Sequence, residues 1–263
     1  MIRHAAGDVP YYTFAAFAGH SEIAHAVFTR LGGVSRHPYR SLNVGHSVGD
    51  DPRAVGENHR LVQEALKVRE AEVVTARQVH SNHVACVTAR DRGRVLPGTD
   101  ALISGDAGVT LLLRFADCLP VFIYDAQRSV IGLGHAGWRG TAAKIACQMV
   151  STMIAFYGSD PASMIAALGP AIGPCCYRVG DEVVGAISNS LPDWQGAIHP
   201  YGDGHFSLDL WEANRQQLMD CGIREVETGR LCTACHADEF FSHRAEGGNT
   251  GRFAALLGIR MPA

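Results

Sequence analysis

The sequence contains no apolar run long enough to cross a bilayer, and its longest runs, such as residues 109–113, span only a few residues. It also contains no long basic or acidic run, although the net charge is −3. Nucleic-acid-binding proteins typically carry a basic stripe, so this class is disfavoured. The N-terminus lacks a basic start followed by an apolar stretch. We therefore expect no secretion signal, no membrane contact and a cytoplasmic protein.

Internal repeats, low-complexity segments and Ser/Pro-rich linkers are also missing from the sequence. The composition, with 47% hydrophobic and 19% charged residues, is ordinary for a globular protein with a sizeable core. Mixed chains of 263 residues often form one domain. We therefore expect a single domain over residues 1–263.

The spacing of apolar residues predicts a mixture of helices and strands. An Asp-Asp-Pro sequence at residues 50–52 is typical of a helix start, and an apolar face follows as far as Leu66. A long helix is predicted over residues 140–157, with Gly158 as its end. Further helices are expected over 181–187 and 209–219, and strands over 73–79, 83–88, 109–115, 121–124, 130–133 and 164–168. Because helices and strands do not alternate strictly, the predicted fold class is α+β.

Eight cysteines need an explanation, because disulfides are rare in a reducing cytosol. They should be packing groups, metal ligands or nucleophiles. Cys86, Cys147 and Cys221 have apolar or helical surroundings and are interpreted as packing groups. Cys175 and Cys176 follow a Gly/Pro-rich turn. Adjacent side chains point in different directions, so we expect at most one of this pair to line a pocket.

Residues 232–236 read Cys-Thr-Ala-Cys-His, which is the pattern of covalent c-type haem attachment. That function needs an oxidising compartment, and we expect no export. Cys232 and Cys235 could instead hold a structural metal. No second Cys/His pair accompanies them in the sequence, so we interpret them as buried thiols.

Three short segments concentrate polar chemistry at the ends of apolar strands. They contain His80, Cys118 and His135, in the sequences RQVHS, ADCLP and GHAGWRG. Two imidazoles and one thiolate suit zinc, and three widely spaced ligands are typical of a catalytic site with an open position. The same residues also suit a metal-free cysteine nucleophile with a histidine base. A lone histidine beside a strand is more often a structural residue than a ligand.

Arg139 lies in a glycine-rich turn that precedes the predicted long helix. The N–H groups at a helix N-terminus and a nearby guanidinium both favour an anion, so phosphate could bind here. The alternative is that Gly137 and Gly140 only turn the chain and that Arg139 faces solvent.

The motifs RQVHS, ADCLPV, GHAGWRG, GPAIGPCCY and FFSHR with GNTGR together resemble the YfiH family. Its members are also described as DUF152, laccase-domain, polyphenol oxidase or FAMIN-like proteins. The resemblance extends from about residue 29 to the end, with the motifs in a fixed order. It implies a single mixed α/β domain with layered β-sheets flanked by helices. It also implies a zinc site made by His80, Cys118 and His135, which would be the catalytic residues.

The resemblance further implies purine nucleoside chemistry. The expected reaction is phosphorolysis of adenosine, inosine, guanosine or methylthioadenosine, with adenosine deamination as a second activity. On this hypothesis Arg139 binds phosphate, with Arg244 and Arg252 as further candidates, and Asn43 and Gln78 bind ribose or base. The expected ligands are a small-molecule nucleoside and phosphate. The sequence does not indicate a protein partner.

Other functions stay open. Bacterial proteins of this kind are also linked to peptidoglycan editing, and a Cys-His hydrolase could cleave a peptidoglycan amide or ester. Copper can replace zinc at nitrogen and sulfur ligands and could give laccase-like activity, but none of the 13 histidines lie two positions apart, as multicopper oxidases require. A non-catalytic module that binds a nucleotide-like ligand is a further possibility. The chain departs from the family pattern at Leu113-Arg114-Phe115 and at Cys235-His236, and both differences could alter substrate preference.

Overall fold

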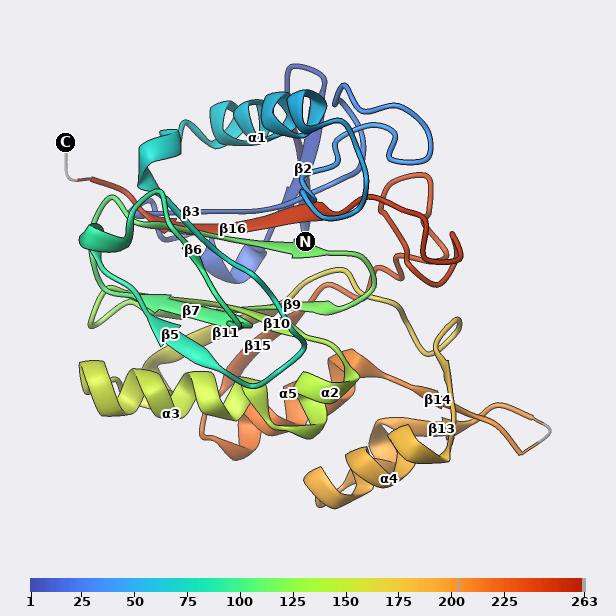
Figure 1. The fold of residues 1–263 in the computed structure, drawn as a ribbon. Helices are drawn as coiled ribbons and strands as arrows, with labels where there is room; N and C mark the ends of the chain where they lie inside the picture. Colours follow the sequence, from blue (N-terminus) through green and yellow to red (C-terminus); the bar gives the residue numbers. More distant parts are fainter. Residues whose placement is uncertain (203, 262–263) are drawn as a thin grey trace.

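Two large β-sheets lie face to face in the computed structural model, which describes residues 1–202 and 204–261 (Figure 1). The first sheet has seven strands in the order β1-β2-β3-β16-β8-β4-β6. They are β1 (Ile2–Ala6), β2 (Val9–Thr13), β3 (Ile23–Phe28), β4 (Val73–Ala76), β6 (Val95–Leu96), β8 (Thr110–Phe115) and β16 (Phe253–Ile259). The late strand β16 lies between β3 and β8 and is antiparallel to both, so the C-terminal segment is part of the core.

The second sheet has six strands in the order β15-β11-β9-β10-β7-β5. They are β5 (Val84–Cys86), β7 (Ala101–Ser104), β9 (Leu119–Asp125), β10 (Val130–Ala136), β11 (Met164–Leu168) and β15 (Glu225–Thr228). A small third sheet, in the order β12-β14-β13, contains β12 (Arg178–Val179), β13 (Ile198–Pro200) and β14 (Phe206–Leu208). The chain passes between the two large sheets at two places that matter below, from β4 to β5 and from β8 to β9.

Helices cover the outer faces of the two large sheets and complete four layers (Figure 1). Helix α1 (Pro52–Leu66) covers the seven-stranded sheet, and α3 (Ile145–Tyr157) and α5 (Leu210–Asp220) cover the six-stranded sheet. The other helices are α2 (Trp138–Ala142), α4 (Asp181–Ser190) and short 3₁₀ turns at 15–17, 70–72, 89–91, 161–163 and 194–196. Apolar side chains such as Phe115, Phe122, Leu133 and Leu257 are fully buried between the sheets. Burial of such side chains is the main source of stability.

The predicted helix starts are confirmed at two places. Asp51 accepts a hydrogen bond from the backbone N–H of Arg53, and Asp209 accepts one from that of Glu212, so each caps its helix. The predicted single helix over 140–157 is wrong, because α2 and α3 are separate. Between them Lys144 adopts a left-handed conformation with φ of 59°, which interrupts the helical hydrogen bonding.

The fold class predicted from the sequence is confirmed: helices and strands mix, and the sheets are layered and flanked by helices. The strand predicted over 73–79 ends at Ala76, and the three N-terminal strands β1, β2 and β3 were not predicted. Within the described residues, no helix combines the length and apolar character needed to cross a membrane.

Candidate metal centre and cavity

Three strand ends bring His80, Cys118 and His135 together. His80 lies in the connection that leaves β4, Cys118 lies in the turn between β8 and β9, and His135 lies near the end of β10. The parallel pairing of β4 with β8 places the first two connections at the same edge of one sheet. The register of β9 with β10 pairs His135 with Pro120, two residues beyond Cys118. Residues that are far apart in the sequence therefore meet at one junction of the two sheets.

The three side chains form a compact group, which we name the triad. One ligand atom from each residue lies within 4.8 Å of the others, as one metal ion would require. The ring centroids of His80 and His135 are 5.0 Å apart, and the rings are nearly perpendicular. A Cβ atom at Gly137 would lie only 2.8 Å from the Sγ of Cys118. Glycine is therefore required at this position for the backbone to pass close to the thiol.

Asp100 positions the triad, although no sequence motif indicated this residue. Its carboxylate is fully buried and accepts hydrogen bonds from the backbone N–H groups of Val79, His80 and Ser81, and from the Ser81 hydroxyl. It also accepts a hydrogen bond of 3.0 Å from Nδ1 of His135. Burial opposes ionisation of Asp100, but the hydrogen bonds from His135 and Ser81 hold its pKa below the usual range.

The electrostatics of the triad favour the thiolate form of Cys118. Burial alone would raise its pKa, but the charge and hydrogen bond of His135 and the nearby His80 lower it to about 6. Burial would likewise lower the pKa of His135, but the Cys118 thiolate and Asp100 raise it to about 9. A thiolate is both the form that binds metals and the form that acts as a nucleophile.

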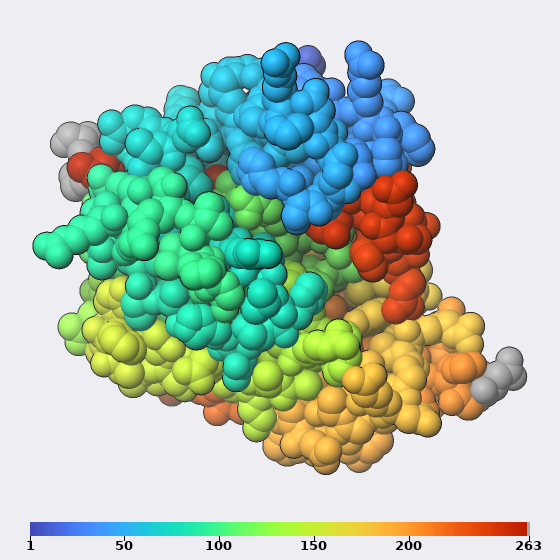
Figure 2. Space-filling view, viewed as in Figure 1, coloured from blue at the N-terminus to red at the C-terminus, as the bar shows by residue number. Residues whose placement is uncertain are grey.

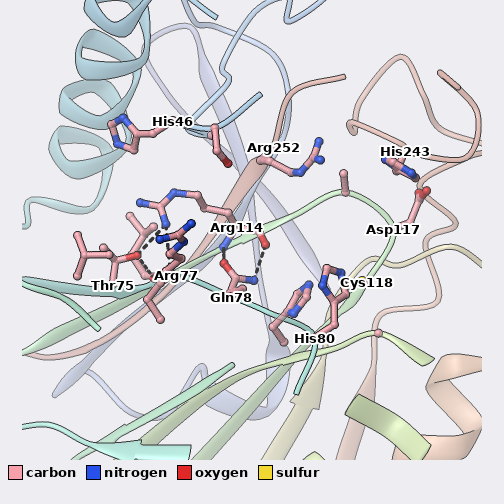
Figure 3. A pocket seen from close by; sticks show the side chains of 18 of the residues that line it. His46, Thr75, Arg77, Gln78, His80, Arg114, Asp117, Cys118, His243 and Arg252 are labelled. Carbon is pink, nitrogen blue, oxygen red and sulfur yellow. Dashed lines mark hydrogen bonds between the residues drawn. The ribbon is translucent and has the colours of Figure 1, made fainter. Parts of the chain in front are cut away.

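The triad opens into a cavity of about 1150 Å³. Figure 2 shows this face hollowed between the light-blue segment above and the teal and yellow-green segments below. The lining includes seven arginines, which are Arg60, Arg77, Arg94, Arg114, Arg139, Arg244 and Arg252, but only two acidic residues, Glu70 and Asp117. In Figure 3, His80 and Cys118 lie on one side of the cavity and Arg77 and Arg114 on the other. The excess of positive charge favours an anionic or phosphate-bearing ligand.

The three arginines among the predicted substrate residues all line this cavity. Arg139 is exposed at the start of α2. Its guanidinium carbon lies 4.2 Å from the ring centroid of the preceding residue, Trp138. Arg244 is exposed and lies over the ring of Tyr177 at 5.1 Å. Arg252 is half-buried and donates hydrogen bonds to nearby carbonyl oxygens. Helix α2 is only five residues long, so the anion site expected from a long helix behind Arg139 depends on the arginines instead.

The side chains of the two predicted polar substrate residues, Gln78 and Asn43, are held by hydrogen bonds within the protein. Gln78 lines the cavity, but its amide exchanges two hydrogen bonds with the backbone of Arg114, at 2.8 and 3.0 Å. Asn43 is fully buried and does not belong to the cavity lining. Its amide oxygen accepts from the N–H groups of Gly45 and Arg252, and its amide nitrogen donates to Asp50. Asn43 therefore holds the loops behind the cavity wall together.

Several cavity residues were not among those predicted. Arg114 is held by the carbonyl oxygens of Val44 and Ala76 and by the Thr75 hydroxyl, and burial lowers its pKa to about 10. The rings of His46 and His59 stack at 4.9 Å beside it. The sequence marked Arg114 only as an unusual residue before the ADC motif. Nothing in the sequence indicates that α1 brings His59 to the same cavity.

The comparison with known families decides the family of this chain. The family described as multi-copper polyphenol oxidoreductase laccase matches residues 24–260. The chain belongs to this family. The matched segment contains the whole triad and all the predicted substrate residues, and the expected resemblance to YfiH and DUF152 proteins is confirmed.

Members of the laccase family with similar sequences are named as purine nucleoside phosphorylases. The protein YlmD of Geobacillus stearothermophilus is 40% identical over 88% of both chains. A purine nucleoside phosphorylase of Bacteroides thetaiotaomicron is 35% identical over 94% of both chains. The crystal structure of G. stearothermophilus YlmD matches with a TM-score of 0.93, 38% identity and 98% coverage of both chains. That of Bacillus licheniformis YfiH gives 0.92, 37% identity, and coverage of 98% of this chain and 99% of the other.

Proposed function

We propose that this chain is a zinc-dependent purine nucleoside phosphorylase with adenosine deamination as a second activity. The substrates would be adenosine, inosine, guanosine or methylthioadenosine, together with phosphate. The observation that carries the proposal is that the triad faces a cavity lined with arginines. The names of the relatives support the phosphorylase reaction. The deaminase reaction, the individual substrates and the metal go beyond those names.

The donor set of the triad fits zinc. Two imidazole nitrogens and one thiolate are common zinc ligands, and three protein ligands leave a position for water or substrate. Asp100 binds Nδ1 of His135, which directs the other ring nitrogen away from the carboxylate and fixes the ring. When bound by His80, Cys118 and His135, zinc would supply a Lewis acid for an oxygen of phosphate or water.

The arginines supply what phosphorolysis needs from the protein. A phosphate oxygen forms a bond to the anomeric carbon of ribose while the bond from that carbon to the purine nitrogen breaks. The proton that the phosphate loses goes to this purine nitrogen, and the purine leaves as the free base. Arg139 and Arg244 present exposed guanidinium groups to the cavity and can bind phosphate through paired N–H donors. Arg252 also lines the cavity and adds positive charge to it (Figure 3).

The test separates the two reactions by their products. With adenosine and phosphate, phosphorolysis gives adenine and ribose 1-phosphate. With adenosine and water, deamination gives inosine and ammonia. We expect both activities in protein that contains about one zinc per triad, and we expect both to be lost in the variants His80→Ala and Cys118→Ser. The matched control is Cys86→Ser, a half-buried thiol outside the cavity. Full activity in metal-free protein with the triad replaced would overturn the proposal.

Copper competes for the same donor set, because divalent copper binds nitrogen and sulfur ligands more tightly than zinc does. The family description makes polyphenol oxidation the reaction to test in copper-loaded protein. We propose zinc as the ion in the native protein. Oxidation of a phenol by copper-loaded protein and none by zinc-loaded protein would assign that activity to the substituted metal.

One observation favours a second candidate, a cysteine hydrolase acting on an amide or ester such as those of peptidoglycan. Asp100, His135 and Cys118 form a chain in which a carboxylate orients an imidazole beside a thiolate. This is the arrangement of a nucleophile with its base. The hydrolase hypothesis predicts covalent labelling of Cys118 by an electrophile at the same rate with and without zinc. Protection of Cys118 by one equivalent of zinc favours the metalloenzyme.

A further inference from the structure

Four cysteines outside the triad form a second cluster. Cys175 and Cys176 follow β11, and Cys232 and Cys235 follow β15. All four Sγ atoms lie within 4.8 Å of one another. The Sγ of Cys235 is 3.5 Å from that of Cys175 and 3.5 Å from that of Cys176. The interpretation that Cys232 and Cys235 lack a second pair of ligands is therefore wrong, because the adjacent cysteines supply it.

The fold brings the two pairs together through parallel strands. β11 and β15 are neighbours that run in the same direction, so the loops after them leave the sheet at the same edge. Backbone pairing continues beyond the strands at an isolated bridge between Ala171 and Cys232. The N–H of Ala171 donates to Leu231, and the N–H of Thr233 donates back to Ala171. The two cysteine-bearing loops are thus fixed relative to each other by main-chain hydrogen bonds.

The spacing of the sulfur atoms suits a single tetrahedral ion. With metal–sulfur bonds of about 2.3 Å, the corners of a tetrahedron are about 3.8 Å apart. The separations of 3.5 Å and the limit of 4.8 Å bracket that value. A disulfide needs sulfur atoms about 2.05 Å apart and uses only two of the four thiols. All eight cysteines of the described structure are free thiols.

The backbone around Cys232 is also arranged for a thiolate. The N–H of Gly173 donates to the Sγ of this buried cysteine at 3.2 Å. A Cβ atom at Gly173 would lie 3.2 Å from the Cβ of Cys232 and 3.3 Å from the Sγ of Cys175. Glycine is the residue that lets the main chain approach both cysteines so closely. A backbone donor directed at a sulfur stabilises the negative charge that metal binding requires.

We propose that Cys175, Cys176, Cys232 and Cys235 bind one zinc-class ion in a closed, four-thiolate structural site. This site is separate from the triad and does not depend on the proposed enzymatic function. Four protein ligands leave no open position, so its role is structural.

The contacts around the cluster show what such an ion would stabilise. Thr233, between the two later cysteines, donates its hydroxyl to the carboxylate of Asp117 at 2.6 Å. The N–H of Ile172 donates to the backbone oxygen of Asp117 at 2.9 Å. Asp117 precedes Cys118 of the triad, and Tyr177, next to Cys176, lines the cavity. The ion would hold the loops that form this wall of the cavity.

The first experiment measures metal per chain by mass spectrometry in protein purified without chelators. We expect Cys232→Ser and Cys235→Ser each to lose about one equivalent of zinc relative to the unmodified protein. Cys86→Ser, which changes a half-buried thiol elsewhere, should lose none. The double variant His80→Ala with Cys118→Ser removes the triad, so any remaining equivalent belongs to the four-cysteine site. In this background, cobalt(II) should give the intense visible bands of a tetrahedral thiolate complex.

Two results would overturn the proposal. One is a metal content that Cys232→Ser leaves unchanged in folded protein. The other is a disulfide between two of these cysteines, seen as an intact mass about 2 Da lower than that of the reduced chain. In that case, alkylation of the remaining thiols would release no metal. If the serine variants fail to fold, Cys235→His keeps a ligand at that position. It should then retain the ion and shift the cobalt bands, whereas a cluster without metal would show no such spectrum.

Discussion

The carboxylate of Asp100 and the imidazole of His135 form a buried carboxylate–histidine pair behind the cavity wall, with Oδ1 and Nδ1 3.0 Å apart. The backbone of the two residues is also joined, because the N–H of His135 donates to the carbonyl oxygen of Asp100 at 2.8 Å. Asp100 at the same time fixes the loop that carries His80. A single buried carboxylate therefore positions two members of the triad.

Replacing Asp100 by Asn should weaken metal binding at the triad. One of its two oxygen acceptors becomes an NH₂ donor that faces N–H groups, so His80 and His135 lose their orientation. Changes of this kind typically cost about 10- to 100-fold in metal affinity. Competition with a chromogenic chelator measures the affinity. Asp106→Asn, a carboxylate outside the cavity, is the control, and equal affinities in the two variants would argue against a positioning role.

Gly137→Ala should remove metal from the triad while leaving the fold intact. The new Cβ would be 2.8 Å from the Sγ of Cys118, so the thiol must shift. Gly180→Ala is a matched control, because both glycines precede a helix with extended backbone angles and Gly180 has open space around it. Zinc content and the melting temperature should be measured for both. Both variants are made in the Cys232→Ser background, so that the zinc content reports the triad alone. Retention of that zinc by Gly137→Ala would contradict the requirement for glycine beside Cys118.

Arg139→Ala should raise the KM for phosphate more than it changes the KM for the nucleoside. The loss of a charge-assisted hydrogen bond typically costs about 1.5–3 kcal/mol, which corresponds to roughly a 10- to 150-fold rise in KM. Initial rates at varied phosphate concentration measure the effect. Arg53→Ala removes an exposed arginine outside the cavity and should change neither constant. A rise in the KM for the nucleoside alone would instead indicate that Arg139 contacts the nucleoside.

The protein should lose stability as the pH falls from about 6.5 to 4. Burial lowers the pKa of His25 to about 4, and its Nε2 accepts a hydrogen bond from the N–H of Phe14, which also favours the neutral ring; burial likewise lowers the pKa of His59 to about 4. The unfolded chain therefore takes up protons at a higher pH than the folded chain does. Stability is complete above the unfolded pKa of about 6.5, and each group contributes a loss of at most about 3 kcal/mol on acidification.

Unfolding by urea at several pH values tests this prediction. His25→Gln keeps a polar side chain beside Phe14 but does not titrate, so its stability should fall less over the same range. His205→Gln changes an exposed histidine away from His25 and should leave the pH dependence as it was. An unchanged slope in His25→Gln would mean that other groups cause the acid instability.

The residue types of the triad could be recognised in the sequence, because each lies in a short motif where an apolar strand ends. That they bind zinc stays a prediction, as does the single domain over residues 1–263. Asn43 shows the limit of reasoning from motifs. A polar residue in a family motif was expected to contact substrate, whereas the structure buries its amide among three loops. Polarity alone does not reveal whether a side chain faces a cavity or the backbone.

The sequence by itself determined the mixed fold class, the helix starts at Asp51 and Asp209, and the residues of the candidate metal centre. Local periodicity and capping chemistry depend on neighbours within a few positions, so they can be read along the chain. Only the tertiary structure decided that α2 and α3 are separate, that Asp100 orients His135, and that Cys175 and Cys176 meet Cys232 and Cys235. These contacts depend on which strands pair and in which direction, and the free energy that selects the pairing comes from burial across the whole core.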